Sequence, residues 1–220
     1  MHYDSTSGKI TFRILRRAKD FLKSIRAGVF AVWNWLRHLQ TPGKLKRYNK
    51  LHLGCGKRHI DGWANVDIAG VGNIIWDLRR KLPVAEHSIQ YIYAEHFIEH
   101  ITKDEATALL ASCKLFLSEG GILRLSTPDL RLLVKNYMVG NVVDLRAHAG
   151  WMASSPCAMV NESMRWWGHQ FLYDEEELTA LLKAVGFGSV HRVQWGVSEN
   201  LSLQNLETRP DFGEIILEAQ

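Results

Sequence analysis

Residues 50–220 predict an α/β fold, namely a seven-stranded, mostly parallel β-sheet with helices on both faces and an antiparallel edge strand. Short apolar runs alternate with helix-like patterns along this part of the chain, which is typical of parallel strands covered by helices. The last two apolar runs have no helix between them. We therefore expect one of these two strands to run antiparallel at the edge of the sheet.

Each strand is expected where a short apolar run meets a turn. The seven expected strands occupy residues 50–56, 64–68, 73–78, 89–95, 121–129, 189–196 and 212–219. Amphipathic helices are expected over residues 104–117, ending at Gly120–Gly121, and over residues 174–187, where the first turn is acidic. The weakly patterned, aromatic-rich insert at residues 131–173 is interpreted as a cover on the substrate side.

Length and composition favour one well-cored domain with an appendage, since the chain has 220 residues. Its three cysteines, Cys55, Cys113 and Cys157, are odd in number and share no metal-like spacing, so we expect a reducing compartment. The longest apolar run, residues 27–33, is too short to span a bilayer, and the N-terminus lacks a signal-peptide core. A cytoplasmic location is therefore expected.

Charge divides the chain near residue 50. Residues 1–50 hold 12 lysines and arginines against two acids, Asp4 and Asp20, whereas the rest of the chain is acidic. An acidic body is unfavourable for binding a polyanion, so we expect no nucleic-acid partner. Residues 1–49 are predicted to be a basic, amphipathic, helical segment that precedes the domain at residues 50–220.

The role of residues 9–39 within that segment is left open. Basic and apolar residues alternate there with mostly helical spacing. One interpretation is a helix packed on the domain. The other is a cationic segment that lies on an anionic membrane, at its inner face, or on a partner protein.

A glycine turn with an acid nearby predicts a site for a ribose-containing cofactor. Gly54 and Gly56 follow the first strand, and Asp67 ends the second. Glycines let the backbone approach a ligand, the following helix is expected to offer free N–H groups, and the acid can accept both ribose hydroxyls. The third glycine of a dinucleotide motif is replaced by His59, and Asp67 follows Gly54 by only 13 residues. This spacing disfavours NAD and suits S-adenosylmethionine better.

With these motifs in order, residues 50–220 resemble the class I S-adenosylmethionine-dependent methyltransferases, which have a Rossmann-like fold. They are most similar to small methyltransferases often placed with surface-polysaccharide pathways. The resemblance implies that Gly54, Cys55 and Gly56 back the methionine end of the cofactor. It also implies that Asp67 binds the ribose, and that the adenine contacts Ile68, Asp77 and Leu78. Glu95 and His96 would lie near the sulfonium. Lys57 departs from the longer glycine motif of the family, and Asp77 could instead be a helix N-cap.

The stretch His96-x-x-Glu99-His100 has the shape of an inverted zinc-protease motif, but its place after the fourth strand favours the methyltransferase interpretation. Some relatives, the small-RNA ribose and ubiquinone-pathway O-methyltransferases, hold a divalent cation here with Glu-x-x-Glu-His. A metal bound by His96, Glu99 and His100 is thus one alternative. We favour the other, in which Glu99 and His100 cap and brace the helix and no metal is bound.

The expected reaction is transfer of a methyl group from S-adenosylmethionine to a hydroxyl, rather than an amine, of a small molecule or saccharide. Such a transfer needs a group that takes the acceptor's proton. The candidate catalytic residues are His169 and His96, ahead of Asp129. His169 and Asp129 could instead fasten loops or cap helices. The alternative function is a partner subunit that binds S-adenosylmethionine without catalysis, and the oligomeric state is left open.

Overall fold

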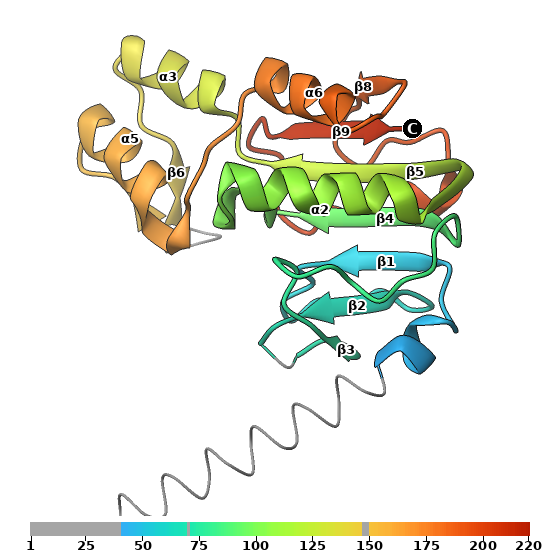
Figure 1. Ribbon diagram of the computed structural model, residues 1–220. Coiled ribbons are helices and arrows are strands. Elements are labelled where there is room, and N and C mark those ends of the chain that lie inside the picture. The colour runs from blue at the N-terminus through green and yellow to red at the C-terminus, as the bar shows by residue number, and fades with distance from the viewer. Residues whose placement is uncertain (1–40, 70, 147–149) are drawn as a thin grey trace, which may run out of the picture. The chain divides into compact units, whose positions relative to one another are not determined.

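A computed structural model describes residues 41–69, 71–146 and 150–220 (Figure 1). The predicted amphipathic segment at residues 9–39 lies outside the described residues. Residues 42–220 form one compact unit, which begins eight residues before the predicted start at residue 50. Leu45 is buried in the core of this unit and Tyr48 packs against that core, so residues 42–49 belong with the sheet domain.

The predicted seven-stranded sheet is confirmed, with the order β3-β2-β1-β4-β5-β9-β8. Strands β1 to β5 are parallel, β9 is antiparallel to β5, and β8 is antiparallel to β9. The antiparallel strand β9 thus lies one place inside the edge, and β8 lies outside it. The strands are β1 (Lys50–Leu53), β2 (Ala64–Asp67), β3 (Ile74–Ile75), β4 (Ile89–Glu95), β5 (Leu117–Thr127), β8 (Val190–Arg192) and β9 (Ile215–Ala219).

Strand order creates a crevice position between β1 and β4. The chain passes from β1 to β2 on one side, whereas β4 pairs with the other side of β1, with Leu53 opposite Ala94. In open α/β sheets, ligands bind beyond the carboxyl ends of the strands at such a switch point. Gly54 and Glu95 are the residues that flank it here.

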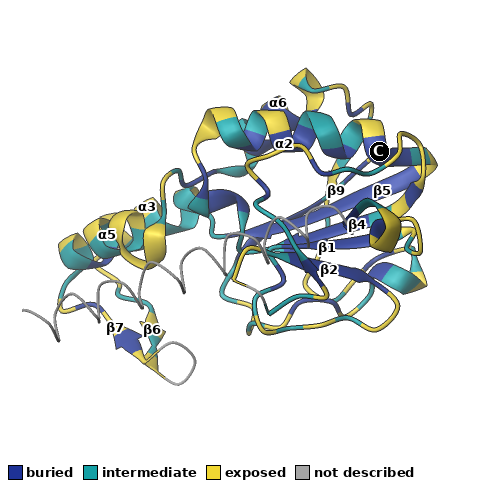
Figure 2. Cartoon of the chain, turned by 60° about the horizontal axis from the view of Figure 1, so that its bottom comes forward, coloured by how far each residue is buried: buried dark blue, intermediate teal, exposed yellow. Residues whose placement is uncertain are grey.

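One face of the sheet is covered by helices α2 (Lys103–Phe116) and α6 (Glu175–Ala184), which share the main core with it (Figure 2). Thr102 and Glu105 form a capping box at the start of α2. This helix ends at Phe116, earlier than predicted, because residues 117–121 already belong to β5. Gly121 permits that pairing, since a Cβ there would lie 3.1 Å from the carbonyl oxygen of Ile89.

The opposite face is covered differently from the prediction. Its buried cluster, Trp63, Tyr93, Ile122, Leu203 and Leu206, joins the sheet to the loop before β2 and to the 3₁₀ helix η3 (Leu201–Leu203). Within the described residues, no helix lies between β1 and β2, although one was expected after the glycine turn. Only residues 54–63 connect these two strands, which is too short for a helix and its two turns.

The aromatic-rich insert forms a small lobe beyond the carboxyl ends of β4 and β5 (Figure 1). It contains α3 (Leu130–Met138), the hairpin of β6 (Asp144–Leu145) and β7 (Trp151–Met152), α5 (Pro156–Arg165) and the 3₁₀ helix η2 (Trp166–Gly168). A separate buried cluster of Trp151, Ala153 and Met159 holds the lobe together. Outside the lobe, a further 3₁₀ helix, η1 (Ile98–His100), follows β4. None of the described helices has the length and apolar character needed to cross a membrane.

Candidate active site

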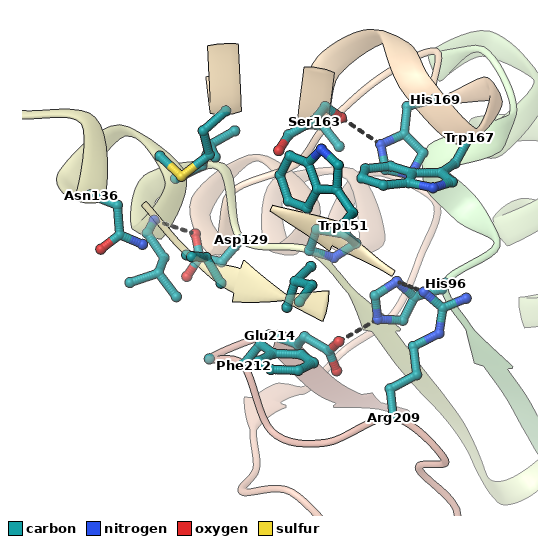
Figure 3. Close-up of a pocket in the computed structure, with 18 of the residues that line it drawn as sticks. His96, Asp129, Asn136, Trp151, Ser163, Trp167, His169, Arg209, Phe212 and Glu214 are labelled. Atoms are coloured by element: carbon teal, nitrogen blue, oxygen red, sulfur yellow. Dashed lines mark hydrogen bonds and ion pairs between the residues drawn. The ribbon is translucent and has the colours of Figure 1, made fainter. Parts of the chain in front are cut away.

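A cavity of about 490 Å³ lies between the sheet and the insert lobe (Figure 3). Residues that follow β4 and β5 line it from one side, together with the loop before β9, and the insert lines it from the other. Its polar lining includes His96, Asp129, Asn136, His169, Arg209 and Glu214, and its aromatic lining is Trp151, Trp167 and Phe212. The insert that was interpreted as a cover therefore lies over a cavity.

His96 is held on the cavity wall with both ring nitrogens occupied. Its Nε2 donates to Glu214 Oε1 at 2.5 Å, and its Nδ1 lies 3.2 Å from Glu99 Oε1 and 3.0 Å from Nη1 of Arg209. Nδ1 cannot both accept from Arg209 and carry a proton toward Glu99. Although burial opposes the charged form, the contacts with Glu214 and Glu99 raise the pKa of His96 to about 9. The protonated ring is therefore favoured, which does not fit the predicted role of His96 as a base.

Strained backbone marks the same cavity wall. His96 and Trp167 have φ values of 48° and 57°, in the left-handed region that costs a residue with a side chain about 1–2 kcal/mol. They are two of the four non-glycine residues with positive φ in the described part of the chain. Such strain persists where the surrounding structure enforces it, and it is concentrated at functional sites.

His169 presents a free basic nitrogen to the cavity. Its Nδ1 lies 2.6 Å from the carbonyl oxygen of Ser163, which can only accept, so Nδ1 carries the proton and Nε2 keeps its lone pair. Burial lowers the pKa of His169, which keeps the ring neutral at neutral pH. His169 and His96, two of the candidate catalytic residues, thus line the same cavity.

Asp129 lines the cavity but also caps a helix. Its Oδ1 accepts from the backbone N–H groups of Arg131 and Leu132 at the start of α3, and its Oδ2 lies 3.7 Å from Arg192. The capping alternative raised for Asp129 therefore applies. Capping does not explain Glu99, because Thr102 caps α2 and η1 has no side-chain cap, but Glu99 Oε2 accepts from the hydroxyl of Thr127 and so braces η1 against β5.

Phe97, the residue after His96 of the cavity wall, packs on the glycine turn. A Cβ at Gly54 would come within 2.4 Å of the Phe97 ring, so the ring packs directly on this glycine. The backbone N–H groups of Gly54 and Cys55 donate to Val66, and that of Gly56 donates to Asp67 Oδ2 at 2.9 Å. The free N–H donors expected at this turn are thus already used within the fold.

The acid at the end of β2 keeps room for a ligand. Asp67 Oδ1 accepts from the N–H of Ala69 at 2.7 Å and Oδ2 from that of Gly56, so each oxygen retains a lone pair. Ile68, beside it, is 61% exposed, and nothing lies within 4 Å of a Cβ built on Gly56. These three residues present an open, partly apolar surface.

Three residues that the family resemblance placed at the cofactor have other partners in the structure. Asp77 pairs with Arg79, whose Nη2 lies 2.7 Å from Oδ2, and no helix begins at Asp77. The Leu78 side chain is 5% exposed and lies in the core, which leaves only its backbone for a ligand. Glu95 accepts from the backbone and hydroxyl of Thr208, so it holds the loop before β9 rather than pointing freely at the crevice.

That loop supplies site residues that the sequence analysis missed. Arg209, Phe212 and Glu214 reach the cavity from residues 209–214, ahead of the last strand. A proline, a glycine and charged residues close together before a strand mark a loop, but nothing in the local pattern says that it faces β4.

No protein-family model matches the sequence, and no curated protein matches it. Solved structures that are similar to the chain include three methyltransferases. The carbon methyltransferase CurJ is 14% identical over 80% of this chain and 49% of its own, with a TM-score of 0.45. A methyltransferase that uses S-adenosylmethionine, from Archaeoglobus fulgidus, is 14% identical over 84% and 93% of the two chains, with a TM-score of 0.48. One from Mesorhizobium loti is 16% identical over 78% and 89%, with a TM-score of 0.47. This chain thus spans about half the length of the CurJ structure.

Proposed function

We propose that this chain is an S-adenosylmethionine-dependent methyltransferase that acts on a hydroxyl of a small molecule or saccharide. The observation that carries the proposal is the place of the cavity. It opens beyond β4 and β5, and its lining includes His96, which follows Glu95 at the switch point, and His169, whose Nε2 keeps its lone pair. The switch point of an α/β sheet is where such a ligand is expected.

The residues at the end of β2 fit the cofactor. Asp67 can accept the two ribose hydroxyls with its remaining lone pairs, and the exposed side chain of Ile68 can pack on the adenine. Gly56 leaves space for the ligand to approach the backbone. Leu78 and Asp77 contribute less than the family pattern implied, because one is in the core and the other is paired with Arg79.

The cofactor, when bound, supplies a methyl group on a sulfonium that needs no further activation. The protein must therefore position the acceptor and assist the loss of its proton. His169 is the group we assign to that second task, since its Nε2 lone pair is on the cavity wall. His96 instead positions Glu214 and Glu99, because its two nitrogens are committed to contacts inside the wall.

The cavity lining supports an acceptor with both apolar faces and hydroxyl groups. Trp151, Trp167 and Phe212 can pack on the apolar faces of a sugar ring, and Asn136 can hydrogen-bond its hydroxyls. A role in a surface-polysaccharide pathway belongs to this proposal and rests on the sequence resemblance.

The test is transfer of a labelled methyl group from S-adenosylmethionine to saccharide and small-molecule fractions. We expect His169→Ala to lower turnover by about 10²-fold or more while affinity for S-adenosylhomocysteine is kept. His191→Ala, on the exposed face of β8, is the matched control and should transfer methyl groups normally. Cofactor binding without transfer to any fraction would contradict the proposal and favour a non-catalytic binding subunit.

A further inference from the structure

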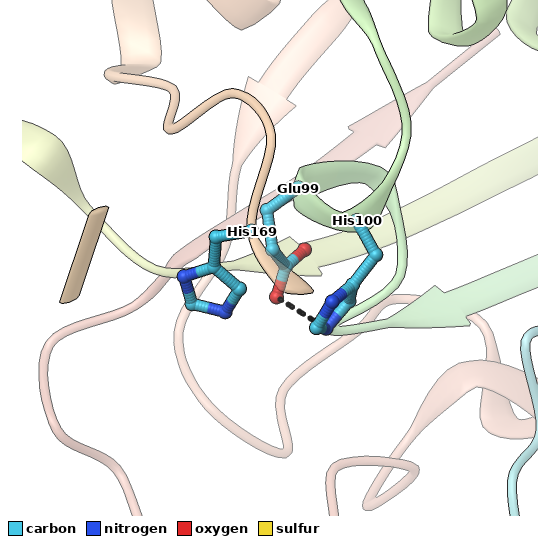
Figure 4. A group of neighbouring side chains, drawn as sticks. All are labelled: Glu99, His100 and His169. Carbon is cyan, nitrogen blue, oxygen red and sulfur yellow. Dashed lines mark ion pairs between the residues drawn. The ribbon is translucent and has the colours of Figure 1, made fainter. Parts of the chain in front are cut away.

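Glu99, His100 and His169 come together on one side of the cavity (Figure 4). The cation set that the sequence offered as an alternative was His96, Glu99 and His100, whereas the ligand atoms that lie together in the structure belong to Glu99, His100 and His169. One ligand atom of each of the three residues lies within 4.8 Å of the others, and Glu99 Oε1 is 3.9 Å from Nε2 of His100. His100 and His169 line the cavity, so this group is reached from the acceptor side.

Glu99 carries the observation that points to a ligand. Its side chain is 0% exposed, and Oε1 has no hydrogen-bond partner, whereas Oε2 accepts from the hydroxyl of Thr127 at 3.0 Å. His96 Nδ1 is 3.2 Å from Oε1, but that contact does not have hydrogen-bond geometry. A buried carboxylate oxygen without a hydrogen bond is costly, and binding a cation removes that cost.

The two histidines are arranged as metal ligands are. The Nδ1–H of His169 donates to the carbonyl oxygen of Ser163, which fixes the tautomer and turns Nε2 toward Glu99 and His100. A backbone carbonyl on the other nitrogen is the usual second partner of a histidine that binds a metal. The ring centroids of His100 and His169 are 4.9 Å apart with the rings near perpendicular, so both can converge on one point.

Two segments far apart in the sequence are tied together at this point. The N–H of Gln170 donates to the carbonyl oxygen of Glu99 at 2.7 Å, and Nε2 of Gln170 donates to that of His100 at 2.8 Å. These bonds keep the backbones of the three candidate ligands in register. A metal bound at about 2.1 Å needs ligand atoms about 3–3.5 Å apart, so side-chain rotations of roughly one ångström complete the site.

We propose that Glu99, His100 and His169 bind one divalent first-row transition-metal ion that coordinates the acceptor hydroxyl. Two imidazole nitrogens with one carboxylate oxygen favour Zn²⁺, Co²⁺, Mn²⁺ or Fe²⁺ over Mg²⁺ and Ca²⁺, which prefer oxygen ligands. The catalytic part rests on the proposed methyltransferase function and gives the mechanism by which His169 serves it.

The metal acts as a Lewis acid on the acceptor. The hydroxyl oxygen binds the ion, which lowers the pKa of the hydroxyl, and the hydroxyl proton passes to water. That oxygen then forms a bond to the methyl carbon while the carbon–sulfur bond breaks, and the electron pair leaves on sulfur. His169 is a ligand in this scheme, so no proton has to be stored on its ring.

The binding test is calorimetric titration of the tag-free, metal-stripped full chain with Zn²⁺, and visible spectroscopy with Co²⁺, both without cofactor. We expect one ion per chain and a Co²⁺ absorption typical of nitrogen ligands. His169→Gln and His100→Gln should each weaken binding at least about 100-fold, since loss of an outer partner alone costs about 10–100-fold. Glu99→Gln should do the same, and the histidine variants keep the test valid if this buried variant fails to fold. His191→Gln should bind normally.

Absence of stoichiometric binding, or binding that the three variants leave unchanged, would overturn the site. The catalytic role is tested separately in the methyl-transfer assay with metal-stripped protein. Activity that is lost on stripping and restored by Zn²⁺ or Mn²⁺ supports the role, and full activity in the stripped protein overturns it while leaving the proposed function intact. Metal binding without any methyl transfer would instead contradict the proposed function and keep the site.

Discussion

Lowering the pH from 7 to 5 is expected to destabilise this protein through His52, in the strand that leads to the glycine turn. His52 is 2% exposed in β1, and its Nδ1 donates to Oδ1 of Asn65 at 3.1 Å. Burial lowers the pKa of His52 from its ordinary 6.5 to about 4. The folded protein therefore keeps this ring neutral at a pH where the unfolded chain is protonated.

The sign and size follow from linkage. Above pH 6.5 the ring is neutral in both states, so its contribution to stability is fully present. As the pH falls through 6.5 toward 4, the unfolded state binds a proton that the folded state does not, and the free energy of unfolding falls. With a pKa of 6.5 for His52 in the unfolded state and about 4 in the folded state, the loss of unfolding free energy is about 2 kcal/mol between pH 7 and pH 5.

Urea unfolding of the wild type and of His52→Gln at pH 7 and pH 5 measures this loss. Glutamine can still donate to Asn65 but does not titrate, and the carboxylates of the two proteins respond to pH alike. We expect the fall in unfolding free energy to be smaller in His52→Gln by about 2 kcal/mol. An equal fall in the two proteins would refute the assigned pKa and the burial argument behind it.

Three further predictions test packing and the site. Arg124 is fully buried and lies 2.7 Å from Glu207, so Arg124→Met should lower the unfolding free energy by about 3–5 kcal/mol. Its control, Arg146→Met, removes an exposed ion pair and should leave the melting temperature unchanged. Leu78→Ala should lower the unfolding free energy by about 2–4 kcal/mol in urea denaturation with unchanged affinity for S-adenosylhomocysteine, since this side chain lies in the core. A loss of affinity in the folded variant would restore Leu78 to the adenine site. Trp167→Ala should raise the KM for the acceptor in steady-state assays, and an unchanged KM would remove Trp167 from the acceptor site.

Local patterns were enough to predict the seven strands and the turn at Gly54. Each strand is a short apolar run with a turn beside it, and the acid at Asp67 stands out because it ends such a run. The sequence was also sufficient to predict that no helix follows the turn. The ten residues between β1 and β2 are too few for it, and Asn65, which binds both the N–H and the carbonyl of Ile60, holds them as a loop.

The site itself depends on contacts that no local pattern contains. His169 lies beside Glu99 because Gln170 bonds to the carbonyl groups after β4, across a sequence separation of 70 residues for one of these bonds. Likewise, Glu214 joins His96 across 118 residues, and that contact, together with Glu99, raises the pKa of His96. The sequence indicated His96 and His169 as candidate catalytic residues, but only the fold shows which of their ring nitrogens are hydrogen-bonded and which is free.

The central claim is that the surface around Asp67 binds S-adenosylmethionine. Calorimetric titration with S-adenosylhomocysteine of the wild type, Asp67→Ala and Asp61→Ala tests it most directly, because Asp61 is an exposed acid in the same loop region. We predict micromolar-range binding by the wild type and by Asp61→Ala, and loss of binding in folded Asp67→Ala. Absence of binding to the folded wild type, or equal affinity in Asp67→Ala, would contradict the claim.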